Sequence, residues 1–211
     1  MSSNLPINKQ IEKYIDEHSF KLHPVQDEII KHNDTLGKKK KLQISINQCH
    51  FLYLVTKLFK PKEILEIGTF TGLSSLSMCI GLENDSKITT IDKNKETSLV
   101  AKNFFENAKV SEQIDIIIDE AINGINKLIN QKKLFDLIFI DADKENYKKY
   151  YDFIQPVFEG NEHFNKKLLY LACVLSHMDW GLGAFQKAEL VFQETINTPV
   201  SYTHLTLPTK A

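Results

Sequence analysis

A nine-residue stretch, Ile64-Leu-Glu-Ile-Gly-Thr-Phe-Thr-Gly72, constrains the fold more than any other part of the chain. The apolar residues around Glu66 are typical of a buried strand, and the small and apolar residues from Leu73 onward are typical of a helix. Gly68 stands at the junction between the two. A glycine turn between a parallel strand and a helix lets a ligand approach the backbone closely, because no Cβ is in the way. The stretch therefore predicts a ligand-binding strand–turn–helix unit.

The spacing of the glycines discriminates between ligands. A dinucleotide site needs G-x-G-x-x-G, which presents bare backbone and a helix N-terminus to a pyrophosphate. Here Phe70 and Leu73 occupy the second and third glycine positions of that pattern, and Glu66 adds a carboxylate that a phosphate would repel. The turn instead suits a ligand without phosphates that still needs close backbone contact, such as S-adenosylmethionine.

Around this unit the chain alternates between strand-like and helix-like segments. We expect strands at 63–67, 87–91, 114–118 and 135–140, and helices at 73–82, 95–108, 121–131 and 145–156. Such alternation implies βαβ units with right-handed crossovers, and so an α/β fold with a doubly wound, mostly parallel sheet. Amphipathic helical sequence at 7–36, and a helix capped by Ser45 or Asn47 and ending at Phe59, come before the first strand.

Length and composition indicate one soluble globular domain. Of 211 residues, 42% are hydrophobic and 25% charged, and the net charge of −1 gives no general attraction to nucleic acid or membrane. Three cysteines without a C-x-x-C pair predict reduced core thiols in a cytoplasmic protein, with neither a zinc site nor disulfides. Neither a signal peptide nor a membrane span is expected. The domain is expected to cover residues 1–199, because residues 200–211 resemble translated vector sequence; an ordinary tail is the alternative.

Acidic residues stand where the expected strands end. Glu66, Asp92 and Asp141 each close a strand, and the carboxyl ends of parallel strands share one edge of the sheet, so all three are expected to point into one crevice. Asp92 suits the two hydroxyls of a ribose, which its carboxylate can bind in bidentate fashion. Asp143 is expected instead to cap the helix that follows it.

Asp141 and Lys144 are the pair of residues best suited to catalysis. A carboxylate in a crevice suits Mg²⁺, which keeps several waters and takes only one or two protein carboxylates. A lysine beside a cation loses its proton more easily and can act as a base, although a surface lysine in a first helical turn is the alternative. Methyl transfer to a hydroxyl needs both aids, because the hydroxyl must be deprotonated and its oxyanion stabilised. Ser74 and Thr71 suit equally the methionine end of the cofactor or a helix cap.

At these residues the chain resembles the cation-dependent O-methyltransferase family, which includes caffeoyl-CoA and catechol O-methyltransferases and bacterial relatives. The matching segments are 42–48, 64–74, 89–92 and 135–147, within a recognisable core of residues 40–157. The resemblance implies a Rossmann-like S-adenosylmethionine-dependent methyltransferase fold, a catechol-like hydroxyl acceptor and a homodimer. It makes Asp141 a metal ligand and Lys144 the general base. It also implies cofactor contacts at Ile44, Ser45, Glu66, Gly68, Thr69, Ser74, Asp92, Ala121 and Asp141.

The chain departs from this family after Gly160. The family takes further metal ligands from an Asp-Asn pair at the end of the next strand, but no such pair follows here, and Asp179 is the nearest candidate. The C-terminal strands of the family are not recognisable either. Two alternatives therefore stand beside an O-methyltransferase: a truncated remnant that binds cofactor without turnover, and a tRNA hydroxyuridine methyltransferase, with which the lysines at 38–41 are compatible. A dehydrogenase on the same fold is disfavoured by Phe70 and Leu73.

Overall fold

The computed structural model describes residues 9–157, which form the expected α/β architecture. One sheet of four strands has the order β3-β2-β1-β4, and every pairing in it is parallel. The strands are β1 (Glu63–Ile67), β2 (Lys87–Asp92), β3 (Ile114–Ile118) and β4 (Leu137–Ile140). The chain winds outward from β1 in both directions, so the strand order reverses between β1 and β4. Ligands of such sheets bind beyond the carboxyl ends of the strands at this reversal.

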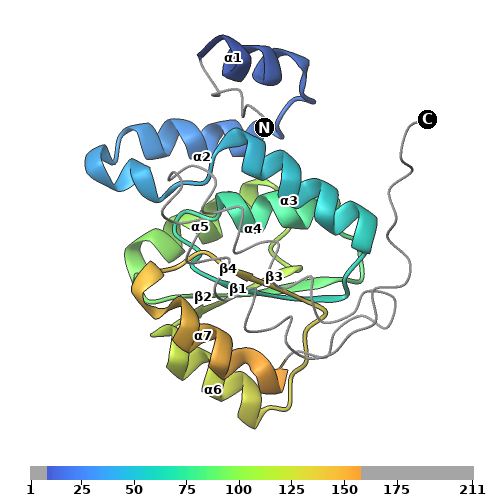
Figure 1. Ribbon diagram of the computed structural model, residues 1–211, viewed down its shortest axis with the longest axis vertical. Coiled ribbons are helices and arrows are strands. Elements are labelled where there is room, and N and C mark those ends of the chain that lie inside the picture. The colour runs from blue at the N-terminus through green and yellow to red at the C-terminus, as the bar shows by residue number, and fades with distance from the viewer. Residues whose placement is uncertain (1–8, 158–211) are drawn as a thin grey trace, which may run out of the picture.

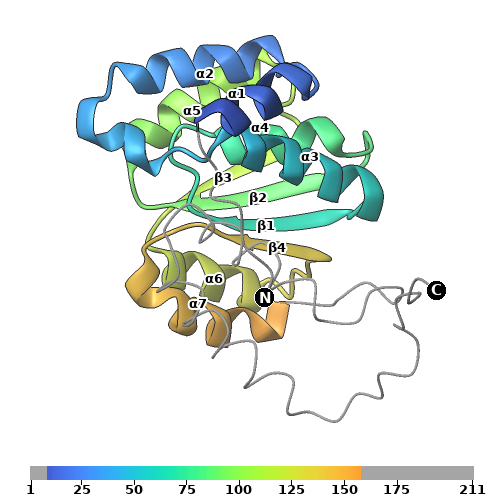
Figure 2. The same cartoon turned by 45° about the horizontal axis from the view of Figure 1, so that its top comes forward.

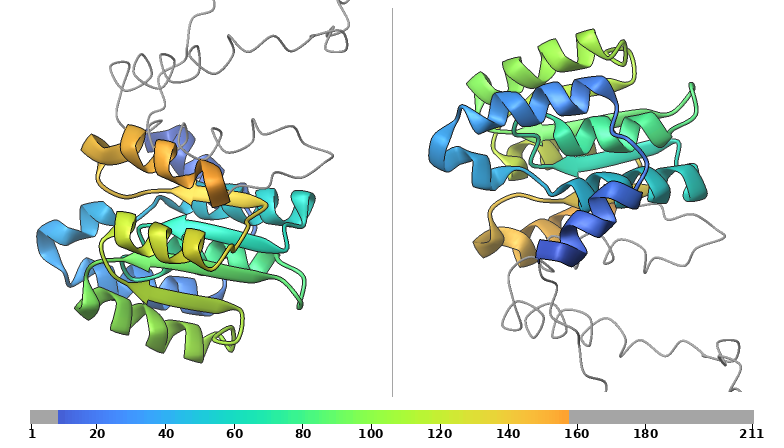
Figure 3. Two further views of the ribbon diagram at one scale, coloured as in Figure 1. Left: turned by 90° about the horizontal axis from the view of Figure 1, so that it is seen from below. Right: turned by 90° about the horizontal axis from the view of Figure 1, so that it is seen from above.

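Helices cover both faces of the sheet (Figures 1 and 2). One layer consists of α2 (Pro24–Asp34), α3 (Ile46–Phe59), α4 (Leu73–Gly81) and α5 (Lys95–Asn107), with α1 (Lys9–His18) outside it. The other layer consists of α6 (Ala121–Asn130) and α7 (Tyr147–Ile154), which lie over the opposite face of the sheet (Figure 3, left). The prediction of a doubly wound parallel sheet is confirmed.

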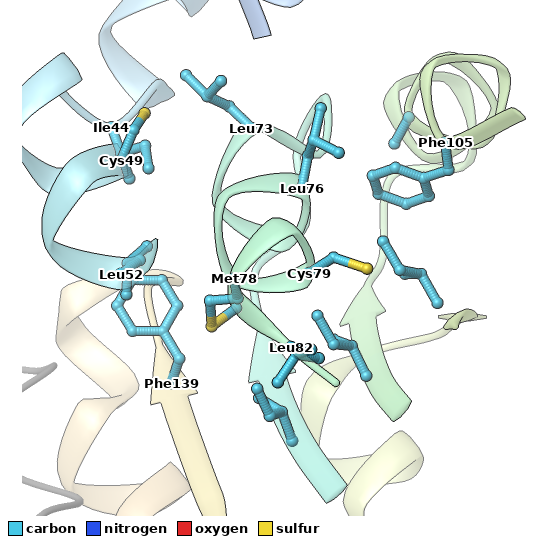
Figure 4. Close-up of a cluster of buried hydrophobic side chains, with 14 of the residues drawn as sticks. Ile44, Cys49, Leu52, Leu73, Leu76, Met78, Cys79, Leu82, Phe105 and Phe139 are labelled. Carbon is cyan, nitrogen blue, oxygen red and sulfur yellow. The ribbon is translucent and has the colours of Figure 1, made fainter. Parts of the chain in front are cut away.

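Each face of the sheet buries a hydrophobic core of its own. Ile64 and Ile88 pack against helices α2 to α5, whereas Leu65 and Ile138 pack against α6 and α7. Strands buried on both faces need nearly continuous apolar sequence, which is what 64–67 and 137–140 contain apart from Glu66. Figure 4 shows part of the first core, where α4 packs between α3, β4 and α5; the labelled side chains are Ile44, Cys49, Leu52, Leu73, Leu76, Met78, Cys79, Leu82, Phe105 and Phe139.

The prediction of buried core thiols is confirmed for the two cysteines within residues 9–157. Cys49 and Cys79 are buried free thiols. Burial raises the pKa of the Cys49 thiol to about 11 and that of the Cys79 thiol to about 12, so both stay protonated at neutral pH. Cys173 lies outside the described residues, as do Asp179, the segment at 200–211 and any strands after β4, so the predictions on them stay predictions.

Most predicted helices and strands are confirmed with small shifts at their ends. Ser45 is the N-cap of α3: its Oγ accepts from the Gln48 backbone N–H at 3.3 Å, and the Gln48 side chain accepts from the Ser45 N–H at 2.7 Å. The helix expected at 145–156 is divided into η2 (Lys144–Asn146), α7 and η3 (Gln155–Val157). The lysines at 38–41 lie in the exposed 3₁₀ helix η1 (Gly37–Leu42). In the described part of the chain, no helix has the length and hydrophobicity that crossing a bilayer requires.

Candidate functional site

The turn after β1 is built around positions that exclude a side chain. Gly68 has a φ of +103°, and a Cβ on it would collide with the backbone carbonyl of Asp141, at the end of the neighbouring strand β4. Gly72 has a φ of +86°, and a Cβ there would lie 2.6 Å from the ring of Phe105. Both positions lie in the left-handed region, which glycine adopts without steric cost. The turn therefore holds β1, β4 and the start of α4 together at the carboxyl edge of the sheet.

Asp92, at the end of β2, fixes this turn from the other side. Its Oδ2 accepts from the backbone N–H groups of Thr69, at 3.0 Å, and Phe70, at 2.7 Å. Its Oδ1 accepts from the Asn94 N–H at 2.8 Å, just before α5. Phe70 is held with a φ of +49°, which is uncommon for a bulky residue. A carboxylate oxygen can accept more than one bond, so Asp92 both shapes the turn and retains acceptor capacity for a ligand.

A cavity of about 550 Å³ opens at this edge, between the ends of β1, β2 and β4. Its volume lies in the range that small-molecule and cofactor sites occupy, roughly 300–1,000 Å³. The structure brings most of the predicted cofactor-binding residues to its wall. The predicted residues that line it are Ile44, Gly68, Thr69, Ser74, Asp92, Ala121 and Asp141.

Three of the residues proposed from sequence do not line the cavity. Ser45 caps α3, as described above, and lines a separate shallow hollow beside the lysines of η1. Thr71 is fully buried behind the turn. Glu66 is also fully buried, so the expectation that Glu66, Asp92 and Asp141 share one crevice holds only for Asp92 and Asp141. The β-strand alternation explains this difference, because Ile67 takes the position facing the cavity and the Glu66 side chain turns under the start of α4.

Glu66 is surrounded by hydroxyl groups. Its Oε1 accepts from Ser74 Oγ at 2.5 Å, and its Oε2 accepts from Ser75 Oγ and from Thr90 Oγ1, the latter at 2.6 Å. Burial raises the pKa of Glu66 to about 7; the three hydroxyl donors oppose this rise, and the negative charge of Asp141 adds to it. The carboxyl group thus changes charge near neutral pH inside the wall of the cavity.

The segment after β4 carries the predicted metal ligand and base. Asp141 lines the cavity, and its backbone N–H donates to the Ile67 carbonyl at 2.9 Å. Lys144 begins η2, and its side chain is outside the described part of the structure, so its role as a base stays a prediction. Asp143 does not cap a helix through its carboxylate as expected. It accepts instead from the side chains of Tyr150, at 2.5 Å, and Asn146.

The Asp143–Tyr150 contact was not predictable from any local pattern, although both residues line the cavity. Tyr150 is buried in the core of α6 and α7, with only its hydroxyl end reaching Asp143. Partial burial acts to raise the pKa of Asp143, but the bonds from Tyr150 and Asn146 outweigh it and hold that pKa below its usual value. Burial and the neighbouring Asp143 carboxylate together raise the pKa of Tyr150, so its phenol stays protonated as a donor.

Charged residues of both signs surround the cavity. Lys39 and Lys41 of η1 lie on its wall, as do Lys93 and Glu120, which form an ion pair at 3.6 Å. Glu120 follows β3, and the two lysines of η1 belong to the basic run noted in the sequence at 38–41. Within residues 9–157 no group of three or more His, Cys, Asp or Glu side chains is arranged to hold a metal ion. Asp141 therefore does not belong to a complete metal site in the part of the chain that is described.

Fold and cavity together define an α/β protein with a small-molecule site at the switch point of a doubly wound sheet. The sequence profile of the O-methyltransferase family matches residues 16–160, more than half of the chain, and the chain belongs to this family. The resemblance found in the sequence is thereby confirmed.

The chain is similar in sequence to several caffeoyl-CoA O-methyltransferases. The chain is 34% identical over 154 residues to a probable caffeoyl-CoA O-methyltransferase of Dictyostelium discoideum, covering 72% of this chain and 61% of that one. It is 31% identical over 150 residues to a putative caffeoyl-CoA O-methyltransferase of Arabidopsis thaliana, covering 69% and 64%. The matched segment therefore spans less than two thirds of the length of these relatives.

Solved structures share the fold at lower identity. An SAH-bound methyltransferase of Podospora anserina superposes with a TM-score of 0.70 at 20% identity, covering 92% of this chain and 91% of that one. An O-methyltransferase of Bacillus cereus in complex with SAH gives a TM-score of 0.69 at 20% identity, covering 90% and 86%. At this identity the likeness establishes the Rossmann-like methyltransferase fold.

Proposed function

We propose that this chain binds S-adenosylmethionine in the cavity at the ends of β1, β2 and β4 and transfers its methyl group to a hydroxyl oxygen. The observation that carries the proposal is the turn at Gly68, which lines the cavity but lacks the further glycines that a pyrophosphate requires. Membership of the O-methyltransferase family and the SAH in two related structures support the same cofactor.

The roles of the cavity residues follow from their chemistry. Asp92 would accept bonds from the ribose hydroxyls while it holds the amides of the turn. Ile44 and Ala121 would provide apolar walls, and Ser74 and Asp141 would bind the methionine end. In the reaction the acceptor oxygen forms a bond to the methyl carbon as the bond from carbon to sulfur breaks in line with it. Holding both partners in this geometry supplies much of the rate enhancement. Lys144 would take the proton of the acceptor hydroxyl.

A divalent cation such as Mg²⁺ is part of the proposal. Bound to Asp141, it would lower the pKa of the acceptor hydroxyl and stabilise the oxyanion. Asp141 alone supplies one carboxylate, which is compatible with Mg²⁺ because this ion retains several waters. The described residues do not complete such a site, so the dependence on a cation has to be tested directly.

The names of the relatives suggest a catechol-like acceptor carried on coenzyme A, as in caffeoyl-CoA. Lys39 and Lys41 at the wall of the cavity would favour an acceptor that carries phosphates. The same lysines would suit a hydroxylated tRNA base, which is the second candidate. We further propose a homodimer, as the family resemblance implies, and a cytoplasmic location, which the free thiols of Cys49 and Cys79 support.

Calorimetric titration of S-adenosylmethionine into the purified chain, with and without Mg²⁺, is the direct experiment. The proposal expects micromolar binding, no binding of NAD, and methyl transfer to caffeoyl-CoA or a free catechol that increases with Mg²⁺. Transfer to tRNA alone would favour the second candidate. Binding without turnover on any of these acceptors would identify a cofactor-binding remnant, and absence of binding would overturn the proposal.

A further inference from the structure

The buried carboxyl of Glu66 determines which hydrogen-bonding groups the cavity wall can offer. A serine or threonine hydroxyl has a single proton to donate. Ser74, Ser75 and Thr90 all direct this proton to Glu66. Ser74 also lines the cavity, so its hydroxyl could offer a ligand there lone pairs only. An ionised Glu66 therefore turns Ser74 into an acceptor.

The hydroxyl proton of Thr69 is committed in the same way. Thr69 and Thr90 have their hydroxyl oxygens 2.6 Å apart, and either could be the donor on geometry alone. Because the proton of Thr90 is committed to Glu66, Thr69 must be the donor in this pair. Thr69 lines the cavity as well, so its hydroxyl also has no proton left for a ligand. Two residues of the cavity wall thus have no hydroxyl proton to offer a ligand, because of one carboxyl group buried behind the wall.

The charges around Glu66 act in the same direction. In β2 and α4 its partners are neutral hydroxyls, and the charged group that acts on it from the end of β4 is the carboxylate of Asp141. Among the described residues, no ion pair includes Glu66. The cavity lining carries the carboxylates of Asp92, Glu120, Asp141 and Asp143 and the lysines Lys39, Lys41 and Lys93, and an ionised Glu66 buried behind it adds a further negative charge. That charge favours a ligand that brings positive charge or donors, and a neutral ligand gains less from it.

We infer that Glu66 is a positioning residue that makes this cavity prefer the cationic cofactor, S-adenosylmethionine, over its neutral product, S-adenosylhomocysteine. The inference rests on the proposed function. The two molecules share the adenosine and the amino acid group and differ in the methyl group and the positive charge on sulfur. Protonated Glu66 would give its proton to a neighbouring hydroxyl and free a donor toward the cavity, which removes the preference. Glu66 would in this way help expel the product after transfer.

The test compares the affinities of both molecules for the wild-type chain and for Glu66→Gln at pH 7.5. The variant keeps the shape of the side chain and removes its charge. Its affinity for S-adenosylmethionine should fall about tenfold, equivalent to roughly 1.4 kcal/mol, with less than about a threefold change for S-adenosylhomocysteine. Ser77→Ala is the matched control, since Ser77 is a buried hydroxyl of α4 that donates to the Leu73 carbonyl and not to Glu66. It should leave the ratio of the two affinities unchanged.

The outcomes separate this inference from the proposed function. If the wild-type chain binds neither molecule, the proposed function and this inference are both wrong. If it binds both molecules and Glu66→Gln leaves the ratio of the two affinities unchanged, only this inference is wrong. A second measurement needs no variant: titrations at pH 7 in buffers of different ionisation enthalpy count the protons released on binding. S-adenosylmethionine should release more protons than S-adenosylhomocysteine, because its charge favours ionised Glu66, and equal release would overturn the inference.

Discussion

The backbone carbonyl of Asp141 lies against Gly68 so closely that no side chain fits at that position. The contact joins the ends of two neighbouring parallel strands, β1 and β4, at the point where the strand order reverses. It places the carboxylate of Asp141 and the open backbone of the turn on the same cavity. The contact therefore couples the shape of the cofactor turn to the residue expected to act in catalysis.

Gly68→Ala tests this contact. The left-handed φ alone costs about 1–2 kcal/mol in an alanine, and the collision with Asp141 adds roughly 1–3 kcal/mol. Gly37→Ala is the matched control, since Gly37 has a φ of +57° but nothing within 4 Å of an added Cβ. Urea unfolding should show the larger loss for Gly68→Ala, together with loss of cofactor binding. Equal losses in the two variants would mean that the strands move apart without difficulty.

Asp92→Ala should weaken cofactor binding by about 1.5–3 kcal/mol, because the ribose hydroxyls lose a charged acceptor and the amides of Thr69 and Phe70 lose their partner. Asp115→Ala is the control: this aspartate is exposed on β3 and does not line the cavity. Calorimetric titration of S-adenosylmethionine measures both. An unchanged dissociation constant for Asp92→Ala would remove the ribose assignment.

The elements and the turn were predictable because their signals are local. Continuous apolar strands, the position of Gly68 and the acids at strand ends can all be read within a few residues, and Asp92 and Asp141 fell where expected. The surroundings of Glu66 were not predictable in the same way. Its burial depends on how the first turn of α4 lies over β1 and β2, which brings Ser74, Ser75 and Thr90 around it. The Asp143–Tyr150 contact likewise depends on the placement of α7.

Glu66 should make the stability of the chain depend on pH. Its pKa is 4.5 in the unfolded chain and about 7 in the fold, so between these values the folded state binds the extra proton. Its contribution to stability is therefore complete below pH 4.5 and is lost as the pH rises through 7, by roughly 3 kcal/mol in total. Glu66→Gln does not titrate. Between pH 5 and pH 8 the free energy of unfolding should fall more in the wild-type chain than in this variant. An equal fall in the two proteins would contradict the assignment.

Tyr150→Phe tests how much the hydrogen bond from Tyr150 to Asp143 stabilises the segment after β4. The variant keeps the buried ring and removes only the hydroxyl that donates to Asp143. Loss of a bond to a carboxylate should cost about 1.5–3 kcal/mol of folding stability, reduced because Asp143 is mostly exposed to water. The pKa of Asp143 should rise toward its ordinary value, which NMR titration of its carboxyl carbon can follow. A pKa that does not change would show that Asn146 and the backbone hold Asp143 without help from Tyr150.

Asp141→Ala separates cofactor binding from activation of the acceptor. Asp92, Ser74 and the turn at Gly68 remain in place, so the affinity for S-adenosylmethionine should change by less than about 1.5 kcal/mol, the worth of a typical hydrogen bond. Stimulation of methyl transfer by Mg²⁺ should disappear, because the proposed carboxylate ligand is gone. Asp143→Ala is the control, since Asp143 lines the same cavity but is already engaged by Tyr150 and Asn146. If Mg²⁺ stimulates Asp141→Ala as strongly as wild type, the cation binds through other residues and the role assigned to Asp141 is wrong.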